Sequence, residues 1–131
     1  MSRRAPLPAS HLLAVSVGGA AGALLRWALV VAFPAAAGGL PWVVVGINVV
    51  GSGLLAALPA LPVVRRHDWV APLLGTGVLG GFTTMSAASV DAVVLGDAGR
   101  PLAGAAYLLV TLGGALLAVL LVRRTTSGVP R

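Results

Sequence analysis

The stretch GVLGGFTTMSAAS, residues 77–89, lies inside a long apolar segment and decides how that segment can fold. It joins the glycine pair Gly80 and Gly81 to two threonines and two serines. Adjacent glycines weaken a helix, and hydroxyl side chains can bond the backbone groups that a break leaves without partners. We therefore predict a membrane helix that breaks in mid-membrane. A glycine-kinked helix with a purely structural role is the alternative.

Apolar residues extend outward from this stretch over the whole chain. Hydrophobic residues make up 58% of the 131 residues and charged residues only 9%, whereas a soluble domain carries about 25% charged residues. A helix of about 20 residues crosses the hydrocarbon core. Four such spans fit the sequence, at residues 10–33, 41–62, 70–95 and 102–122. The sequence thus predicts an all-α membrane protein, a single domain over residues 1–131 with a broken third helix.

The basic residues predict the orientation in the lipid bilayer. All nine are arginines, and most lie in pairs at the ends of apolar runs rather than on a patch that would bind nucleic acid. Arg100 lies alone in a loop on one side of the four-span arrangement, and Arg26 lies within a helix. Seven arginines fall on the other side: Arg3, Arg4, Arg65, Arg66, Arg123, Arg124 and Arg131. This bias predicts a multi-pass plasma-membrane protein with both termini in the cytoplasm.

The composition also excludes several classes of function. The chain contains no cysteine, which removes disulfides, thiolate catalysis and cysteine-based metal sites. No pair of nucleophile and base falls within the apolar segments, so an enzyme is not expected.

A few polar residues in the apolar segments are candidates for an ion route. Asn48, the only asparagine, is surrounded by valine, isoleucine and glycine, and its amide could serve a passing anion or a neighbouring helix. Tyr107 and Thr111 lie four residues apart and share one helix face. Their hydroxyls could extend a polar track, or each could bond a backbone carbonyl. For Arg26 we expect a structural or field-setting role, with the side chain extending toward the far interface. Asp91 lies near the end of the third predicted span, and we expect it to reach water.

Three motifs in this order resemble the CrcB/Fluc fluoride channel family over nearly the full chain. GGAAGALLRW at residues 18–27 is similar to the family's GGxxGAxxR(Y/W) element. VGINVVG at residues 45–51 is similar to its VNxxG stretch, and GGFTTMS at residues 80–86 to its GG(F/L)TTFS break.

The resemblance implies a fluoride-specific channel that exports cytoplasmic fluoride passively and confers fluoride resistance. It implies an antiparallel dimer with two fluoride pathways and a structural sodium ion at its centre. Sodium is placed on the backbone carbonyls of Gly80 and Thr83, beside the structural residue Gly81. The expected anion pathway consists of Asn48, Thr84, Ser86, Tyr107 and Thr111.

The chain departs from the family where two phenylalanines are expected to flank the anion. Met85 and Ala88 stand at these positions, so both aromatic edges are missing. The arginine bias also disfavours a homodimer whose two copies insert in opposite orientations. We therefore expect a partner that is an oppositely oriented homologue, with a homodimer as the alternative.

Two other functions are compatible with the size and composition of the chain. One is a non-conducting scaffold subunit of a heterodimeric channel. The other is a transporter of the small multidrug-resistance type, which has the same size and number of helices. Such a transporter needs a carboxylate in the first span for proton coupling, and residues 10–33 contain none.

Overall fold

A computed structural model describes residues 8–36 and 38–126, and every regular element in this part of the chain is helical. The elements are α1 (Ala9–Ala32), α2 (Trp42–Ala57), η1 (Leu58–Ala60), α3 (Pro62–Arg66), η2 (Pro72–Leu79), α4 (Gly80–Phe82), α5 (Met85–Asp97) and α6 (Pro101–Thr126). Within the described residues, four helical segments are long and apolar enough to cross a membrane: Ala9–Ala32, Trp42–Ala60, Pro72–Asp97 and Pro101–Thr126. The predicted all-α fold with four transmembrane helices is confirmed.

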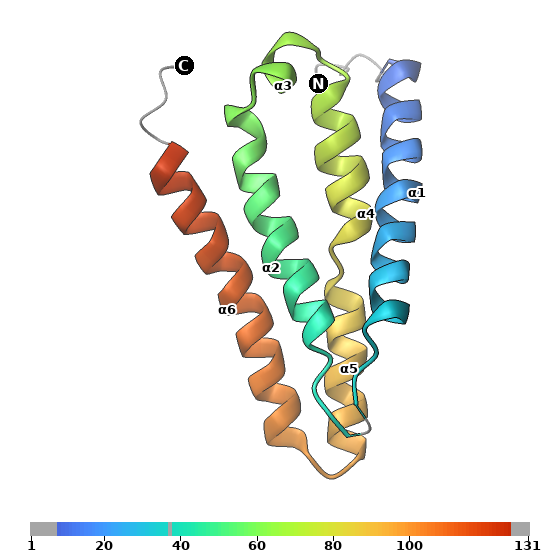
Figure 1. Ribbon diagram of the computed structural model, residues 1–131, viewed down its shortest axis with the longest axis vertical. Coiled ribbons are helices and arrows are strands. Elements are labelled where there is room, and N and C mark those ends of the chain that lie inside the picture. The colour runs from blue at the N-terminus through green and yellow to red at the C-terminus, as the bar shows by residue number, and fades with distance from the viewer. Residues whose placement is uncertain (1–7, 37, 127–131) are drawn as a thin grey trace, which may run out of the picture.

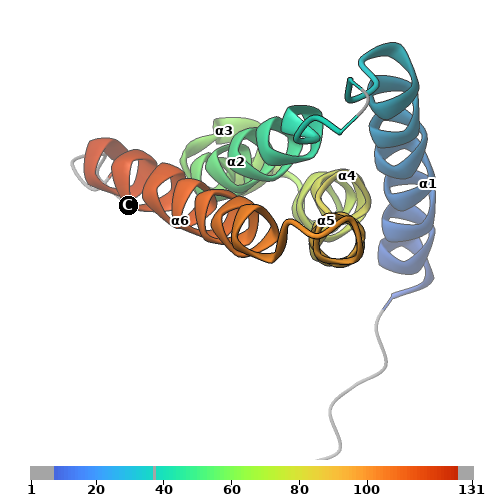
Figure 2. The same cartoon turned by 90° about the horizontal axis from the view of Figure 1, so that it is seen from below.

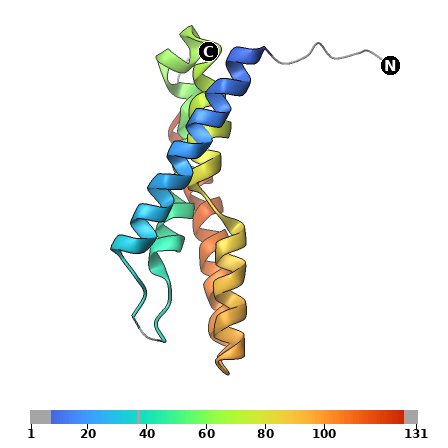
Figure 3. The same cartoon turned by 90° about the vertical axis from the view of Figure 1, so that its right-hand side faces the viewer.

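The third span breaks in its middle, as predicted, but not at its glycines. Gly80 is helical, with φ −66° and ψ −36°, whereas Thr83 (φ −76°, ψ 151°) and Thr84 (φ −153°, ψ 112°) are extended. Threonine is β-branched and tolerates extended backbone well. Figure 3 shows this extended connection between the two halves of the span. The first half is widened: the Gly80 amide bonds back to the Gly75 carbonyl, five residues earlier.

The broken span lies between α1 on one side and the pair α2 and α6 on the other (Figure 2). Its first half, η2 and α4, packs mainly on α1, and its second half, α5, packs mainly on α6. Helix α2 contacts both halves and crosses beside the break (Figure 1). The break therefore has helices on two of its sides.

Glycines allow α1 to approach the first half of the third span backbone to backbone. A Cβ atom at Gly22 would collide with the Val78 carbonyl and lie 2.9 Å from the Phe82 amide. A Cβ at Gly77 would lie 3.0 Å from the Gly18 Cα. Small residues are the usual means of close helix packing in membranes. Gly77 and Gly81 of the third span thus serve packing on α1, while Thr83 and Thr84 form the break.

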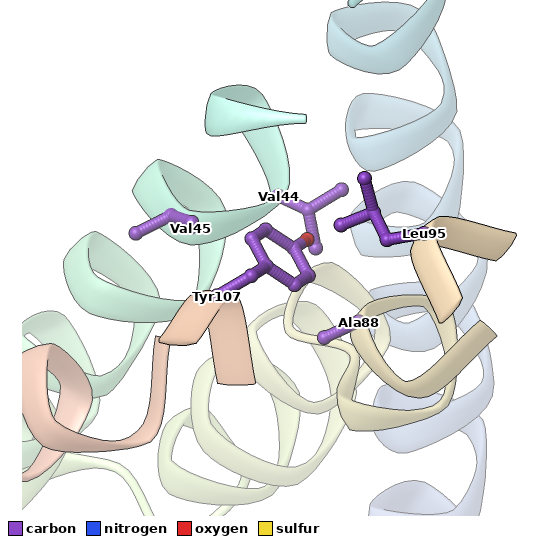
Figure 4. Close-up of a cluster of buried hydrophobic side chains, with 5 residues drawn as sticks. All are labelled: Val44, Val45, Ala88, Leu95 and Tyr107. Atoms are coloured by element: carbon purple, nitrogen blue, oxygen red, sulfur yellow. The ribbon is translucent and has the colours of Figure 1, made fainter. Parts of the chain in front are cut away.

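Large side chains fill the contact between α2, α5 and α6. Val44, Val45, Ala88, Leu95 and Tyr107 form a buried cluster, in which the Tyr107 ring lies between Val44 and Ala88 (Figure 4). This cluster lies on the α5 side of the break, opposite the glycine-packed half.

Four of the six arginines of the described residues lie at one end of the molecule. Arg65 and Arg66 lie in the last turn of α3, and Arg123 and Arg124 lie in the last turn of α6. These turns lie at the end where α1 begins, whereas the turn between α5 and α6, which carries Arg100, is at the opposite end (Figure 1). The other arginines of the predicted bias, Arg3, Arg4 and Arg131, lie outside the described residues.

Candidate functional site

Asn48 holds the extended segment of the third span through two hydrogen bonds to a single residue. The Thr84 amide donates to Asn48 Oδ1 at 2.8 Å, and Asn48 Nδ2 donates to the Thr84 carbonyl at 2.9 Å. Both side chains are buried, with Asn48 only 7% exposed. Asn48 therefore makes the contact to a neighbouring helix that the sequence allowed. Its amide nitrogen carries a second N–H, which this pair of bonds does not use.

The hydrogen bonds around the break redirect two backbone amides. In a continuous helix the Thr84 amide would donate to the Gly80 carbonyl, and the Ala87 amide to the Thr83 carbonyl. Here the Thr84 amide bonds Asn48, and the Ala87 amide donates to Thr84 Oγ1 at 3.1 Å as an N-cap of α5. The carbonyls of Gly80 and Thr83 thus lose their helical donors.

Arg26 reaches the break from α1. Its Nε donates to the Gly81 carbonyl at 3.2 Å, and its side chain is half-buried. We expected this side chain to extend toward the far interface, but its Nε contacts the third span instead. A positive charge lies one residue away from the freed Gly80 carbonyl, and the Gly81 carbonyl is already occupied.

Hydroxyl groups line the start of α5. Thr84 Oγ1 and Ser86 Oγ lie 3.2 Å apart, and the Ser89 hydroxyl donates to the Met85 carbonyl at 3.0 Å. Ser86 is exposed on the surface of the single chain, and so is Gly80 across the break. The candidate site therefore opens toward the outside of the helix bundle.

Tyr107 and Thr111 share a face of α6, as predicted, and both are almost fully buried, at 2% and 1% exposed. The Tyr107 hydroxyl donates to Asp91 Oδ2 at 3.0 Å, and the Thr111 hydroxyl donates to the Tyr107 carbonyl at 2.8 Å. Thr111 thus follows the alternative in which the hydroxyl bonds a backbone carbonyl. Both hydroxyl protons already have acceptors in this conformation.

Asp91 is the residue that the sequence reasoning missed, because it was expected to reach water at the end of the span. It is half-buried on α5 and accepts the Tyr107 hydrogen bond. A signal was available: a carboxylate within an apolar helix requires a donor, and the chain contains a single tyrosine, Tyr107.

Among residues 8–36 and 38–126, no group of three or more His, Cys, Asp or Glu side chains could hold a metal ion. The oxygen atoms at the break belong to backbone carbonyls, such as those of Gly80 and Thr83, and to the hydroxyls of Thr84 and Ser86.

Comparison with known proteins identifies the family. Residues 13–123 match the family described as CrcB-like protein, Camphor Resistance (CrcB). The chain belongs to this family. Its resemblance to CrcB proteins, read from three motifs, is confirmed.

Several relatives carry the name fluoride-specific ion channel FluC. FluC 2 of Streptomyces avermitilis is 43% identical over 100 residues, which cover 75% of this chain and 63% of the relative. FluC of Rhizobium meliloti is 39% identical over 119 residues, covering 84% of this chain and 90% of the relative. FluC 1 of Halobacterium salinarum is 47% identical, covering 82% and 86%. The chain thus spans less than two thirds of the Streptomyces avermitilis protein and most of the other two.

The fold brings the three CrcB motifs together at the break. The first motif supplies Gly22, which lies against the Phe82 amide of the third motif, and Arg26, which bonds the Gly81 carbonyl of the same motif. The second motif supplies Asn48, which bonds Thr84 in the third. The motifs therefore describe one structural unit, the support of the broken helix.

The two positions where this chain lacks the expected phenylalanines lie in different environments. Met85 is 42% exposed at the start of α5, whereas Ala88 is fully buried beside the Tyr107 ring (Figure 4). An aromatic side chain could be accommodated at Met85 without repacking, but not at Ala88.

Proposed function

We propose that this chain is a subunit of a fluoride channel that exports cytoplasmic fluoride passively across the plasma membrane and thereby confers fluoride resistance. The relatives named fluoride-specific ion channel support the substrate. The observation that carries the proposal is the break at Thr83 and Thr84, which is clamped by Asn48. It places freed carbonyls, a guanidinium and several hydroxyls together within the membrane.

The break fits a structural sodium ion on the Gly80 and Thr83 carbonyls. Carbonyl oxygens replace the hydration shell of a hard cation, and these two are the carbonyls whose helical donors are redirected to Asn48 and Thr84. Sodium would supply a fixed positive charge that offsets the cost of a bare anion in low dielectric.

The anion pathway runs along the donor groups near the break and on α6. The second N–H of Asn48 and the hydroxyls of Thr84 and Ser86 line its inner part, and Tyr107 and Thr111 extend it. Fluoride at Tyr107 competes with the Asp91 carboxylate for the same proton. Conduction past this point therefore requires that the Tyr107 hydroxyl turn away from Asp91.

An antiparallel dimer supplies the cover that the break lacks in a single chain. Gly80 and Ser86 are exposed, and an unpaired carbonyl facing hydrocarbon costs several kcal/mol, on the order of 2–7. A second chain packed over this face removes that cost and places the sodium at the dimer centre. The partner is an oppositely oriented homologue that supplies the missing phenylalanines, and a homodimer is the alternative.

The arginine distribution supports a single orientation. Arg65, Arg66, Arg123 and Arg124 lie at one end of the described structure and Arg100 at the other. This end faces the cytoplasm, together with both termini.

Fluoride efflux from liposomes tests the function. We expect the purified chain, coexpressed with a homologue that carries both phenylalanines, to release fluoride and retain chloride. The chain alone should release little. Robust fluoride efflux from the chain alone would instead favour the homodimer, and absence of fluoride efflux from every pairing would refute the channel.

A non-conducting scaffold subunit is the second candidate, and the packing of Ala88 favours it. The Tyr107 ring packs on Ala88, and the Tyr107 hydroxyl donates to Asp91, so both residues already contribute to the core of this chain. Replacement of Asn48 and Thr83 in the coexpressed pair separates the two functions. Unchanged fluoride flux would support the scaffold, whereas loss of flux supports a conducting subunit.

A further inference from the structure

Asn48 bonds Thr84 in the way that a neighbouring strand would. Thr84 has extended dihedral angles, and the Asn48 side chain accepts from its amide and donates to its carbonyl. The partner of the Thr84 amide is therefore a side chain 36 positions earlier rather than the Gly80 carbonyl four positions earlier.

The Thr84 hydroxyl does the same for the next carbonyl. Thr84 Oγ1 accepts from the Ala87 amide at 3.1 Å, and this amide would otherwise bond the Thr83 carbonyl. The Ser86 hydroxyl lies 3.2 Å from the same oxygen, so the cap belongs to a small hydroxyl pair. Two different side chains thus redirect two amides, and each redirection frees one carbonyl.

We propose that Asn48 and the Thr84 hydroxyl are positioning residues of the cation site. Asn48 keeps the Gly80 carbonyl free, and the Thr84 hydroxyl keeps the Thr83 carbonyl free. This inference rests on the proposed function, because it assigns roles toward the sodium ion that the function includes. It gives Asn48 a task distinct from that of donating to fluoride.

The physical reason is that an unpaired amide in the membrane interior must find an acceptor. A buried donor left without a partner costs free energy comparable to a lost hydrogen bond. In a variant without Asn48, the acceptor that a continuous helix offers to the Thr84 amide is the Gly80 carbonyl, and we expect this bond to form and to close the helix. The cation then loses a ligand.

Sodium-dependent unfolding and sodium-dependent flux test the proposal together. The full chain, with its partner where flux requires one, is purified as wild type and as Asn48→Ala, Thr84→Val and Thr84→Ser. Thr76→Val serves as the matched control, because Thr76 is an exposed threonine of the same span away from the break. The midpoint of thermal unfolding and the rate of fluoride efflux are measured over a sodium series, with N-methylglucamine keeping ionic strength constant.

We expect Asn48→Ala and Thr84→Val each to raise the half-saturating sodium concentration by about tenfold, the usual cost of losing a group that orients a metal ligand. Thr84→Ser retains the hydroxyl and should keep the wild-type value, as should Thr76→Val. If Asn48 acted only as a donor to fluoride, Asn48→Ala would lower flux at saturating sodium and leave the half-saturating concentration unchanged. That outcome would overturn its positioning role.

The two proposals fail in different ways. A wild-type chain that conducts fluoride but whose unfolding and flux ignore sodium would overturn the positioning roles and leave the channel intact. A wild-type chain that is stabilised by sodium but conducts no fluoride would overturn the channel and leave the positioning roles to be judged by unfolding alone. Where Asn48→Ala does not fold, the comparison of Thr84→Val with Thr84→Ser decides.

Discussion

The two halves of the third span are held by different chemistry. The first half, η2 and α4, packs on α1 through glycines that bring the two backbones into contact, as at Gly22 and Val78. The second half, α5, packs on α6 through side chains around Ala88 and Tyr107. Because each half has its own support, neither has to continue the helix of the other. The break at Thr83 and Thr84 is stable because both sides of it are fixed independently.

Gly22→Ala should give the largest loss of stability, because it disrupts the backbone contact between α1 and the first half of the third span. The new methyl group would meet the Val78 carbonyl and lie 2.9 Å from the Phe82 amide. Backbone cannot move aside as a side chain can, so we expect a loss of at least about 3 kcal/mol in the free energy of unfolding. Chemical unfolding in detergent measures this loss, and the midpoint of the transition should fall.

Gly19→Ala is the matched control for this prediction. Gly19 lies on the same helix, and a Cβ atom there would meet nothing within 4 Å. Its stability should stay near that of the wild type. Equal losses in the two variants would show that glycine content, rather than backbone contact with the third span, matters in α1.

Ala88→Phe should give the next largest loss of stability, because it disrupts the side-chain packing between α5 and α6. Ala88 is fully buried against Tyr107, and overpacking of this kind costs about 1–3 kcal/mol. Met85→Phe, at a position that is 42% exposed, should cost less than about 0.5 kcal/mol. Thermal unfolding of the two variants measures the difference. A stable Ala88→Phe variant would mean that α5 and α6 are less tightly packed than the structure shows.

The sequence was sufficient for the features that depend on local composition. Apolar runs predicted the four spans to within a few residues. The last helix ends later than predicted, at Thr126 rather than at residue 122. Helical hydrogen bonds can continue past the apolar run, through Arg123 and Arg124. The second span ends as a 3₁₀ turn at Leu58–Ala60, which contains Pro59 and comes shortly before Pro62.

The sequence was insufficient where a side chain selects its partner across the fold. It placed the break but attributed it to glycines, because their contact with α1 is a tertiary feature. It left open whether Asn48 serves an anion or a helix, and the bond to Thr84 spans 36 positions. It placed Asp91 in water, because the Tyr107 hydroxyl that bonds it lies 16 positions away. Composition predicts that polar side chains in an apolar helix need hydrogen-bond partners, but it does not identify those partners.

Tyr107→Phe should give the smallest effect. It separates the hydrogen bond between α5 and α6 from the apolar packing of the same ring. It keeps the ring between Val44 and Ala88 and removes only the hydrogen bond to Asp91 (Figure 4). We expect a loss of about 1 kcal/mol, since polar contacts between membrane helices average about 0.6 kcal/mol and a half-buried carboxylate is left without its donor. Thr111→Val removes a bond to a carbonyl of its own helix, so it should cost less than Tyr107→Phe. Chemical unfolding in detergent measures both. If Tyr107→Phe instead left stability unchanged, the bond to Asp91 would add nothing to the contact between α5 and α6, and the Tyr107 hydroxyl would be available to an anion at little cost in stability.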